Sequence, residues 1–161
     1  PIVSITFMFG GAGIPEMLIA SILLLLTGIF LCALGIFFSS GLKSTTAATI
    51  SSYGSILSPI LLIVVFYFVI NTLSPSDYTV QDQINMISEL WVIASVNPFL
   101  AAYLTQVMLV EDQSLFLISI PLDGNINITL LSPWIIYTIF YIIMIILLIE
   151  ASIRLISQPE K

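Results

Sequence analysis

The chain has 161 residues, of which 59% are hydrophobic and only 7% are charged, and its mean hydropathy is +1.18. This composition is too apolar and too poor in charge for an ordinary water-soluble domain, and it predicts an integral membrane protein. Three basic residues, no histidine and a net charge of −6 argue against a nucleic-acid partner, and the single cysteine excludes an internal disulfide.

The first residues are apolar but lack the basic start and the small-residue cleavage site of a signal peptide. We interpret 1–9 as the end of a preceding membrane helix. Because the chain starts at Pro1 without methionine, we expect it to be a C-terminal fragment. The glycine-rich stretch 10–15 then breaks the helix, and Glu16 stands where an acid favours the start of the next one.

Residues 16–40 predict the first complete transmembrane helix. The run is long enough, at about 1.5 Å per residue, to match a hydrocarbon core about 30 Å thick. Lys43 follows in the turn, and a basic residue there favours the cytoplasmic side. A second transmembrane helix is predicted over 46–73. The two helices form a hairpin with its tip in the cytoplasm.

The first half of this second helix is rich in small residues, whereas its second half is bulky and apolar. Small residues spaced by four let helix backbones approach closely, and a proline inside the run predicts a kink whose freed backbone groups serines can bind. We regard this face as a candidate translocation or helix-packing surface, made of Ala47, Ser51, Gly54, Ser55, Ser58 and Pro59. The pattern leaves both roles open.

Residues 74–132 are predicted to form an extracytoplasmic region. Two short helices, over about 86–96 and 98–110, are separated by an Asn-Pro step that interrupts helical hydrogen bonding. This break and Glu89 argue against a simple lipid-exposed span. We expect a pair of helices that lies at the membrane surface or dips into it and returns; a full fourth span is the alternative.

The segment that follows, 115–130, is an apolar and then polar run with Asp123-Gly124 as a turn. The last transmembrane helix is predicted over 133–157, with Ser132 as its cap. Trp134 and Tyr137 are expected to anchor this helix at the membrane interface.

Glu150 and Arg154 lie one helical turn apart near the end of that helix. This spacing predicts an ion pair, while a buried proton or ion site at the carboxylate is the alternative. With Lys43 inside, Arg154 and Lys161 also fall inside and the C-terminus is cytoplasmic. The sequence thus predicts an all-α, multi-pass protein of a cell membrane, bacterial or archaeal, with three clear transmembrane helices.

Several motifs carry a resemblance to a known family. They are FMFGGAGIPE, then LGIFFSSGLKSTTAATISSYG, an NPF step, and finally SPWIIYTIFYIIMIILLIEASIRL. In this order they resemble the C-terminal part of the type-2 exporter permeases of the ATP-binding-cassette transporters. The resemblance implies a six-helix subunit that pairs with a second permease copy or a paralogue and is driven by a separate cytoplasmic ATPase subunit.

No Walker motif, metal cluster or nucleophile–base pair occurs in the sequence, so we expect no catalytic, cofactor or metal site in the chain itself. Two functions follow as hypotheses. The first is a permease subunit whose small-residue face forms part of a transport path. The second is a non-catalytic structural subunit of a larger respiratory or photosynthetic complex, which uses the same face only for packing.

Overall fold

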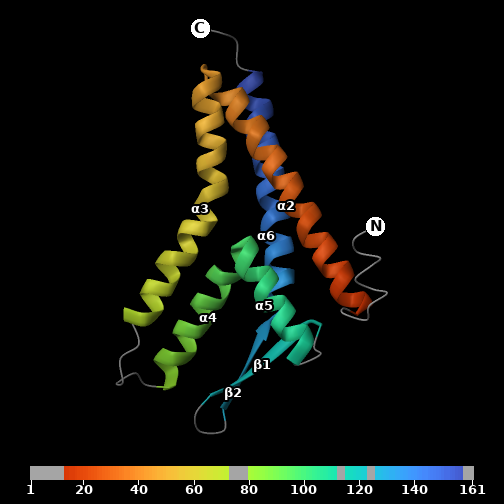
Figure 1. The fold of residues 1–161 in the computed structure, drawn as a ribbon, viewed down its shortest axis with the longest axis vertical. Helices are drawn as coiled ribbons and strands as arrows, with labels where there is room; N and C mark the ends of the chain where they lie inside the picture. Colours follow the sequence, from red (N-terminus) through yellow and green to blue (C-terminus); the bar gives the residue numbers. More distant parts are fainter. Residues whose placement is uncertain (1–12, 73–79, 112–114, 123–125, 158–161) are drawn as a thin grey trace.

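The fold is a bundle of helices with one small β-hairpin (Figure 1). The computed structural model describes residues 13–72, 80–111, 115–122 and 126–157. Its elements are α2 (Ile14–Gly41), α3 (Thr45–Thr72), α4 (Val80–Val96), α5 (Pro98–Glu111), β1 (Leu117–Leu122), β2 (Ile126–Leu131) and α6 (Pro133–Ile156). The helix end expected at 1–9 lies outside the described residues, as do residues 10–12 of the glycine-rich stretch.

Three helices are long and apolar enough to cross a membrane. They are α2, the first 21 residues of α3, and α6. The α4–α5 pair reaches the required length only when its two helices are taken together, so the described residues hold three candidate spans, or four if the pair is one span. Their ranges lie close to the helices predicted from apolar runs at 16–40, 46–73 and 133–157.

Local signals explain where α2 and α3 begin. A Glu16 carboxylate oxygen accepts a hydrogen bond from the Gly13 backbone N–H at 3.1 Å, which ties down the first turn of α2. After α2 ends, the Ser44 hydroxyl accepts a hydrogen bond from the Ala47 N–H at 3.3 Å and so caps α3. The two helices form a hairpin with Lys43 in its turn.

The start of α6 differs in one detail from the sequence prediction. Pro133 takes the first helical position, but the hydroxyl of Ser132 makes no capping hydrogen bond. Because this side chain is buried, its hydroxyl donates instead to the Met108 sulfur at 3.7 Å, which joins α6 to α5. The Ser132 backbone carbonyl accepts the first hydrogen bonds of the helix.

The hairpin turn and the end of α6 lie at one end of the bundle (Figure 1). Gly41, the last residue of α2, lies so close to Leu155 of α6 that an added Cβ would stand 3.3 Å from its methyl carbon. The turn with Lys43 and the helix end with Arg154 are therefore neighbours. At the other end lie the β-hairpin and the start of α4.

α4 and α5 form a sharply bent pair between α3 and α6 (Figure 1). The chain direction bends by 113° at the Asn97-Pro98 step. Proline and the residue before it disfavour a continuous helix at this point. The sequence predicts two helices here, over about 86–96 and 98–110, and in the structure the first begins earlier, at Val80. The tip of the pair is directed into the bundle.

A two-stranded antiparallel hairpin, β1–β2, departs from the all-α prediction. Its register pairs Leu117 with Leu131 and Leu122 with Ile126, and the expected turn at Asp123-Gly124 falls outside the described residues. Alternating β-branched residues in INIT and a central Asp-Gly are typical of a hairpin, which explains the strands physically. The molecule is mostly helical, with this hairpin joining α5 to α6.

The core lies where α2, α5 and α6 meet. Tyr137 is completely buried and stacks on Tyr141, with ring centroids 4.1 Å apart. Phe30 of α2 contacts Tyr141 edge-on at 4.6 Å. The other buried members of this cluster are Ile19, Leu23 and Ala101. Tyr137 is therefore a core residue, which corrects its predicted role as an interfacial anchor.

The outer surfaces of the long helices are strongly apolar. Leu24 on α2 is 75% exposed, Leu61 on α3 is 65% exposed and Ile153 on α6 is 61% exposed. A water-soluble monomer rarely exposes apolar patches of this extent. These surfaces are compatible with a membrane location, in which lipid tails or other subunits cover them.

Candidate functional site

The small-residue face of α3 does not converge on one point in the structure. Ala47, Ser51 and Ser55 are half-buried, whereas Gly54 and Ser58 are exposed. No side chain or other element lies within 4 Å of the position where a Cβ of Gly54 would stand. Within the described chain this part of α3 is thus only partly covered, and Gly54 is open to whatever surrounds the protein.

The serines of α3 are turned back onto their own helix. The Ser52 hydroxyl donates to the Ala48 carbonyl at 2.8 Å, and the Ser55 hydroxyl donates to the Ser51 carbonyl at 2.9 Å. Such hydrogen bonds satisfy a hydroxyl in apolar surroundings without any external partner. The hydroxyl protons of Ser52 and Ser55 are therefore used within α3 and are not available to donate to another element.

Pro59 lies inside α3 and removes one backbone donor from the helix. The carbonyl that loses its usual amide partner belongs to Ser55, four residues earlier. The Ser58 hydroxyl donates to that carbonyl at 3.2 Å. Serine thus supplies the hydrogen bond that proline cannot, as the Ser-Pro sequence suggests, and the helix continues through this point to Thr72.

The tip of the α4–α5 pair is joined to this same point of α3. The side-chain amide of Asn97 donates a hydrogen bond to the Pro59 carbonyl at 2.6 Å. The other half of the amide, its carbonyl oxygen, accepts from the N–H groups of Phe99 and Leu100 at 3.0 and 3.3 Å and caps α5. Asn97 is only 6% exposed, so one buried side chain starts α5 and links it to α3.

Asn97 is the residue of this site that the sequence prediction missed. The Asn-Pro step indicates a helix break, and the residue was interpreted only as part of that break. A buried asparagine needs hydrogen-bond partners for both its amide N–H group and its carbonyl oxygen. An Asn-Pro break inside an apolar segment therefore also indicates that the asparagine contacts another element. The partner on α3 cannot be identified from the sequence, because 38 positions separate the two residues.

Behind the tip, α4 and α5 carry further buried polar side chains. Ser95 is fully buried and donates to the Trp91 carbonyl at 2.7 Å. The hydroxyl of Thr105 is buried and has no hydrogen-bond partner among the described residues. With Asn97 these groups make the inward face of the pair polar, which is unusual for a helix that faces lipid.

A hydrogen bond between two helices fixes α6 against α2. The Thr27 hydroxyl donates to the Leu23 carbonyl at 2.6 Å, and its oxygen lies 2.7 Å from the Tyr137 hydroxyl oxygen. Because the only proton of Thr27 is directed to Leu23, Tyr137 is the donor of the second bond. This side of the bundle is thus held by packing and by a specific polar contact.

The β-hairpin is tied to the helices by two tryptophans. The Trp91 indole N–H of α4 donates to the Leu131 carbonyl at 2.8 Å. The Trp134 indole N–H of α6 donates to the Leu115 carbonyl at the same distance. Leu131 ends β2 and Leu115 lies two residues before β1, so the two bonds hold the open end of the hairpin against the second half of α4 and the first turn of α6.

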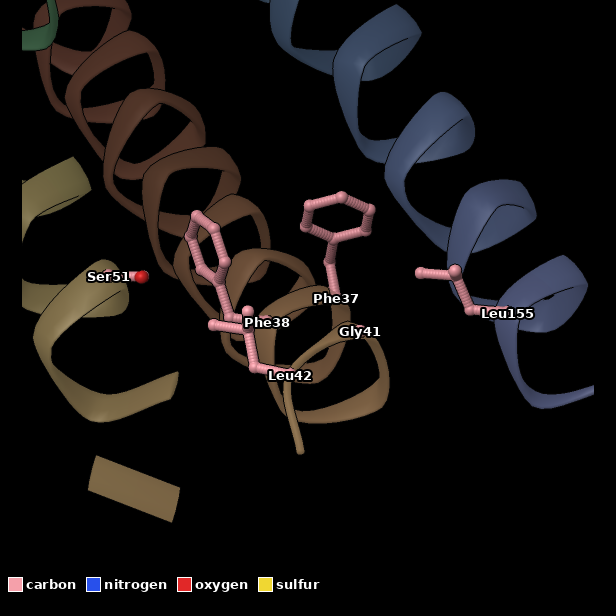
Figure 2. A pocket seen from close by; sticks show the side chains of 6 residues that line it. All are labelled: Phe37, Phe38, Gly41, Leu42, Ser51 and Leu155. Carbon is pink, nitrogen blue, oxygen red and sulfur yellow. The ribbon is translucent and has the colours of Figure 1, made fainter. Parts of the chain in front are cut away.

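A groove of about 300 Å³ lies at the opposite end of the bundle. Figure 2 shows the rings of Phe37 and Phe38 on either side of the end of α2, with Ser51 on α3 and Leu155 on α6. Gly41 and Leu42 complete the lining. The groove is almost wholly apolar and adjoins the turn that carries Lys43.

Glu150 and Arg154 form the ion pair that their spacing predicts. Both side chains are more than half exposed, so the pair contributes little to stability. Within the described residues, no three side chains of the types that bind metals come together.

Comparisons with known proteins gave no match to any family model, curated protein or solved structure.

Proposed function

We propose that this chain is the membrane-spanning permease subunit of an ATP-driven exporter and that a separate ATPase subunit powers it. The observation that carries the proposal is the bent α4–α5 pair, which turns back at 113° with its tip hydrogen-bonded to the middle of α3. The motif resemblance supports the same function, because short extracytoplasmic helices before the last span are a feature of the type-2 exporter permeases.

In this proposal the end with Lys43 and Arg154 faces the cytoplasm, in accordance with the preference of basic residues for that side. Asp82 and Glu89, which lie on α4, then face the outside. The α4–α5 pair does not cross the membrane but closes the outer end of the space beside α3. The polar inward face around Asn97 provides the hydrogen bonds that such a broken segment needs inside an apolar medium.

The transport path is proposed to run along the small-residue half of α3. α3 diverges from α2 and α6 toward the end that carries α4 and α5 (Figure 1), and no residue of its apolar window is buried within the chain. A second permease copy facing this half would enclose a path between them. Its walls would be uncharged and would include the small residues Ala47, Ser51 and Ser55, and movement of α3 would open it to either side.

The experiment that tests this proposal is native mass spectrometry of the complex after gentle solubilisation. A permease is expected to carry an ATPase subunit with Walker motifs and a second membrane subunit. Recovery of the chain with redox or pigment-binding subunits and no ATPase would contradict the proposal. The intact mass of the polypeptide is obtained in the same measurement.

A structural subunit of a larger complex is the second candidate. The observation that favours it is the open surface at Gly54, where another helix can approach the backbone closely. A double variant, Ser51→Leu with Ser55→Leu, separates the two functions. A permease should assemble but lose transport, whereas a packing subunit should lose assembly first. Thr49→Leu on the same helix is the control, because Thr49 is exposed.

A further inference from the structure

The groove at the Lys43 end of the bundle combines an apolar lining with one charged residue beside it. Phe37, Phe38 and Leu155 are among its lining residues, and its volume of about 300 Å³ lies at the lower end of the range for ligand pockets. In a membrane such an apolar groove is filled by hydrocarbon. A charged side chain beside the groove can favour lipids whose headgroup carries the opposite charge.

Lys43 follows directly after Leu42, which lines the groove, and the side chain of Lys43 is exposed. Among the described residues it has no carboxylate partner. The other charges described at this end are Glu150 and Arg154, which neutralise one another. Among the residues that the structure describes, this end of the bundle thus carries one positive charge without a counter-charge, in the turn next to the groove, and that charge is complementary to an anionic headgroup.

A polar group on α3 also lines the groove. Ser51 lies about 9 Å along the axis from the start of α3, at 1.5 Å per residue, and its side chain lines the groove between Phe38 and the rest of α3 (Figure 2). The Ser51 hydroxyl makes no hydrogen bond to any other described residue, so it is free to donate. A lipid whose phosphate lay beside Lys43 would have its ester groups within reach of this hydroxyl and an acyl chain beside the two phenylalanine rings.

We propose that this groove is a binding site for one anionic phospholipid. The phosphate pairs with the Lys43 ammonium group, the Ser51 hydroxyl donates to an ester oxygen, and one acyl chain packs against Phe37, Phe38 and Leu155. The proposal requires that the Lys43 end lies at a membrane surface. It does not require that the protein transports anything, so its test is independent of whether an ATPase subunit accompanies the chain.

The test is lipid retention measured by native mass spectrometry on the full chain, purified with any subunits that accompany it. The protein is mixed with equal amounts of dioleoyl phosphatidylglycerol and dioleoyl phosphatidylcholine. We expect one tightly retained lipid per chain and a preference for phosphatidylglycerol. Lys43→Gln should lower this preference about fivefold, the effect expected of one lysine at an anionic surface, while a lipid is still retained.

Ser51→Leu should reduce retention of both lipids, because the added side chain fills the groove. Leu155→Phe fills it from α6 and is the second variant if Ser51→Leu does not fold. Two controls should leave retention unchanged: Thr49→Leu, and the neutral double variant Glu150→Gln with Arg154→Gln. The proposal is overturned if Lys43→Gln keeps the full preference for phosphatidylglycerol. It is also overturned if Ser51→Leu and Leu155→Phe both retain as much lipid as the unmodified chain. The same holds if these two variants alter the mass of the oligomer and leave lipid retention unchanged.

Discussion

The Asn97 side-chain amide donates to the Pro59 carbonyl oxygen at 2.6 Å, so the turn between α4 and α5 is held at the one position where α3 lacks a backbone donor. The same amide caps α5 through its oxygen. One residue thus determines both where α5 starts and where the bent pair meets α3.

Two variants of Asn97 separate these contributions. Asn97→Ser keeps a side-chain oxygen that caps α5 but is too short to reach Pro59, and we expect a loss of about 1 kcal/mol in unfolding free energy. Asn97→Ala loses the cap as well and should lose about 2 kcal/mol. Circular dichroism during SDS titration in mixed micelles measures both. If Asn97→Ser is as stable as the unmodified chain, the contact with α3 contributes nothing.

The hydrogen bond between Tyr137 and Thr27 is expected to stabilise the packing of α6 on α2. Tyr137→Phe removes the donor and should lower the unfolding free energy by about 0.6 kcal/mol, the average for such bonds between membrane helices. A double-mutant cycle with Thr27→Val should give a coupling of the same size. Tyr53→Phe is the matched control, because Tyr53 is 64% exposed. Additive effects of the two variants would contradict this prediction.

The effects of Ser58→Ala and Pro59→Ala on the unfolding free energy should be strongly non-additive. With proline present, Ser58→Ala leaves the Ser55 carbonyl without its side-chain donor and should cost about 1 kcal/mol. In a Pro59→Ala background the restored backbone N–H takes over this carbonyl, so Ser58→Ala should then cost almost nothing. The same SDS titration measures all four chains. An equal cost of Ser58→Ala in both backgrounds would show that the serine does not compensate for the proline.

The two tryptophans that bond at the open end of the β-hairpin, to Leu131 and to Leu115 just before β1, can be tested one at a time. Trp91→Phe removes the donor to the Leu131 carbonyl, and Trp134→Phe removes the donor to the Leu115 carbonyl. Each should speed amide hydrogen exchange in the hairpin several-fold, because each loses a hydrogen bond worth about 1 kcal/mol. Phe99→Leu, an exposed aromatic change on α5, should leave exchange in β1 and β2 unchanged.

Much of the helical architecture could be predicted because length and apolar composition alone define such helices. The apolar run that becomes α2 and the one that becomes α6 are long, uninterrupted and bounded by turn residues. The bend between α4 and α5 also has a local cause, in Asn97-Pro98. These features depend on neighbours in the sequence, which is why the sequence predicts their positions.

The β-hairpin was missed although its signals are local. LISIPL and INITLL are short apolar runs, and in a chain dominated by helices they resemble irregular connections. The alternation in INIT with an Asp-Gly pair between the two runs is the pattern that identifies the hairpin. A search for period-two alternation between the apolar helices finds it.

The candidate site could be predicted only in part. The Ser-Pro step in α3 indicates that a serine hydroxyl bonds the carbonyl left without its amide partner. In the structure the Ser58 hydroxyl makes this hydrogen bond to the Ser55 carbonyl. The contact of Asn97 with Pro59 and the burial of Tyr137 depend on how distant helices meet. No periodicity within a single helix encodes these meetings, so they follow only from the three-dimensional arrangement.

Thr27 and Tyr137 stand 110 positions apart in the chain. The ribosome therefore completes α2, α3, α4, α5 and the hairpin before it makes the helix that covers the buried face of α2. Until then Ile19 and Leu23 have no α6 to pack against, and this apolar surface stays uncovered in the incomplete chain, where it promotes aggregation. A chain truncated just before Pro133 should thus be degraded rapidly, although every earlier helix has already been synthesised.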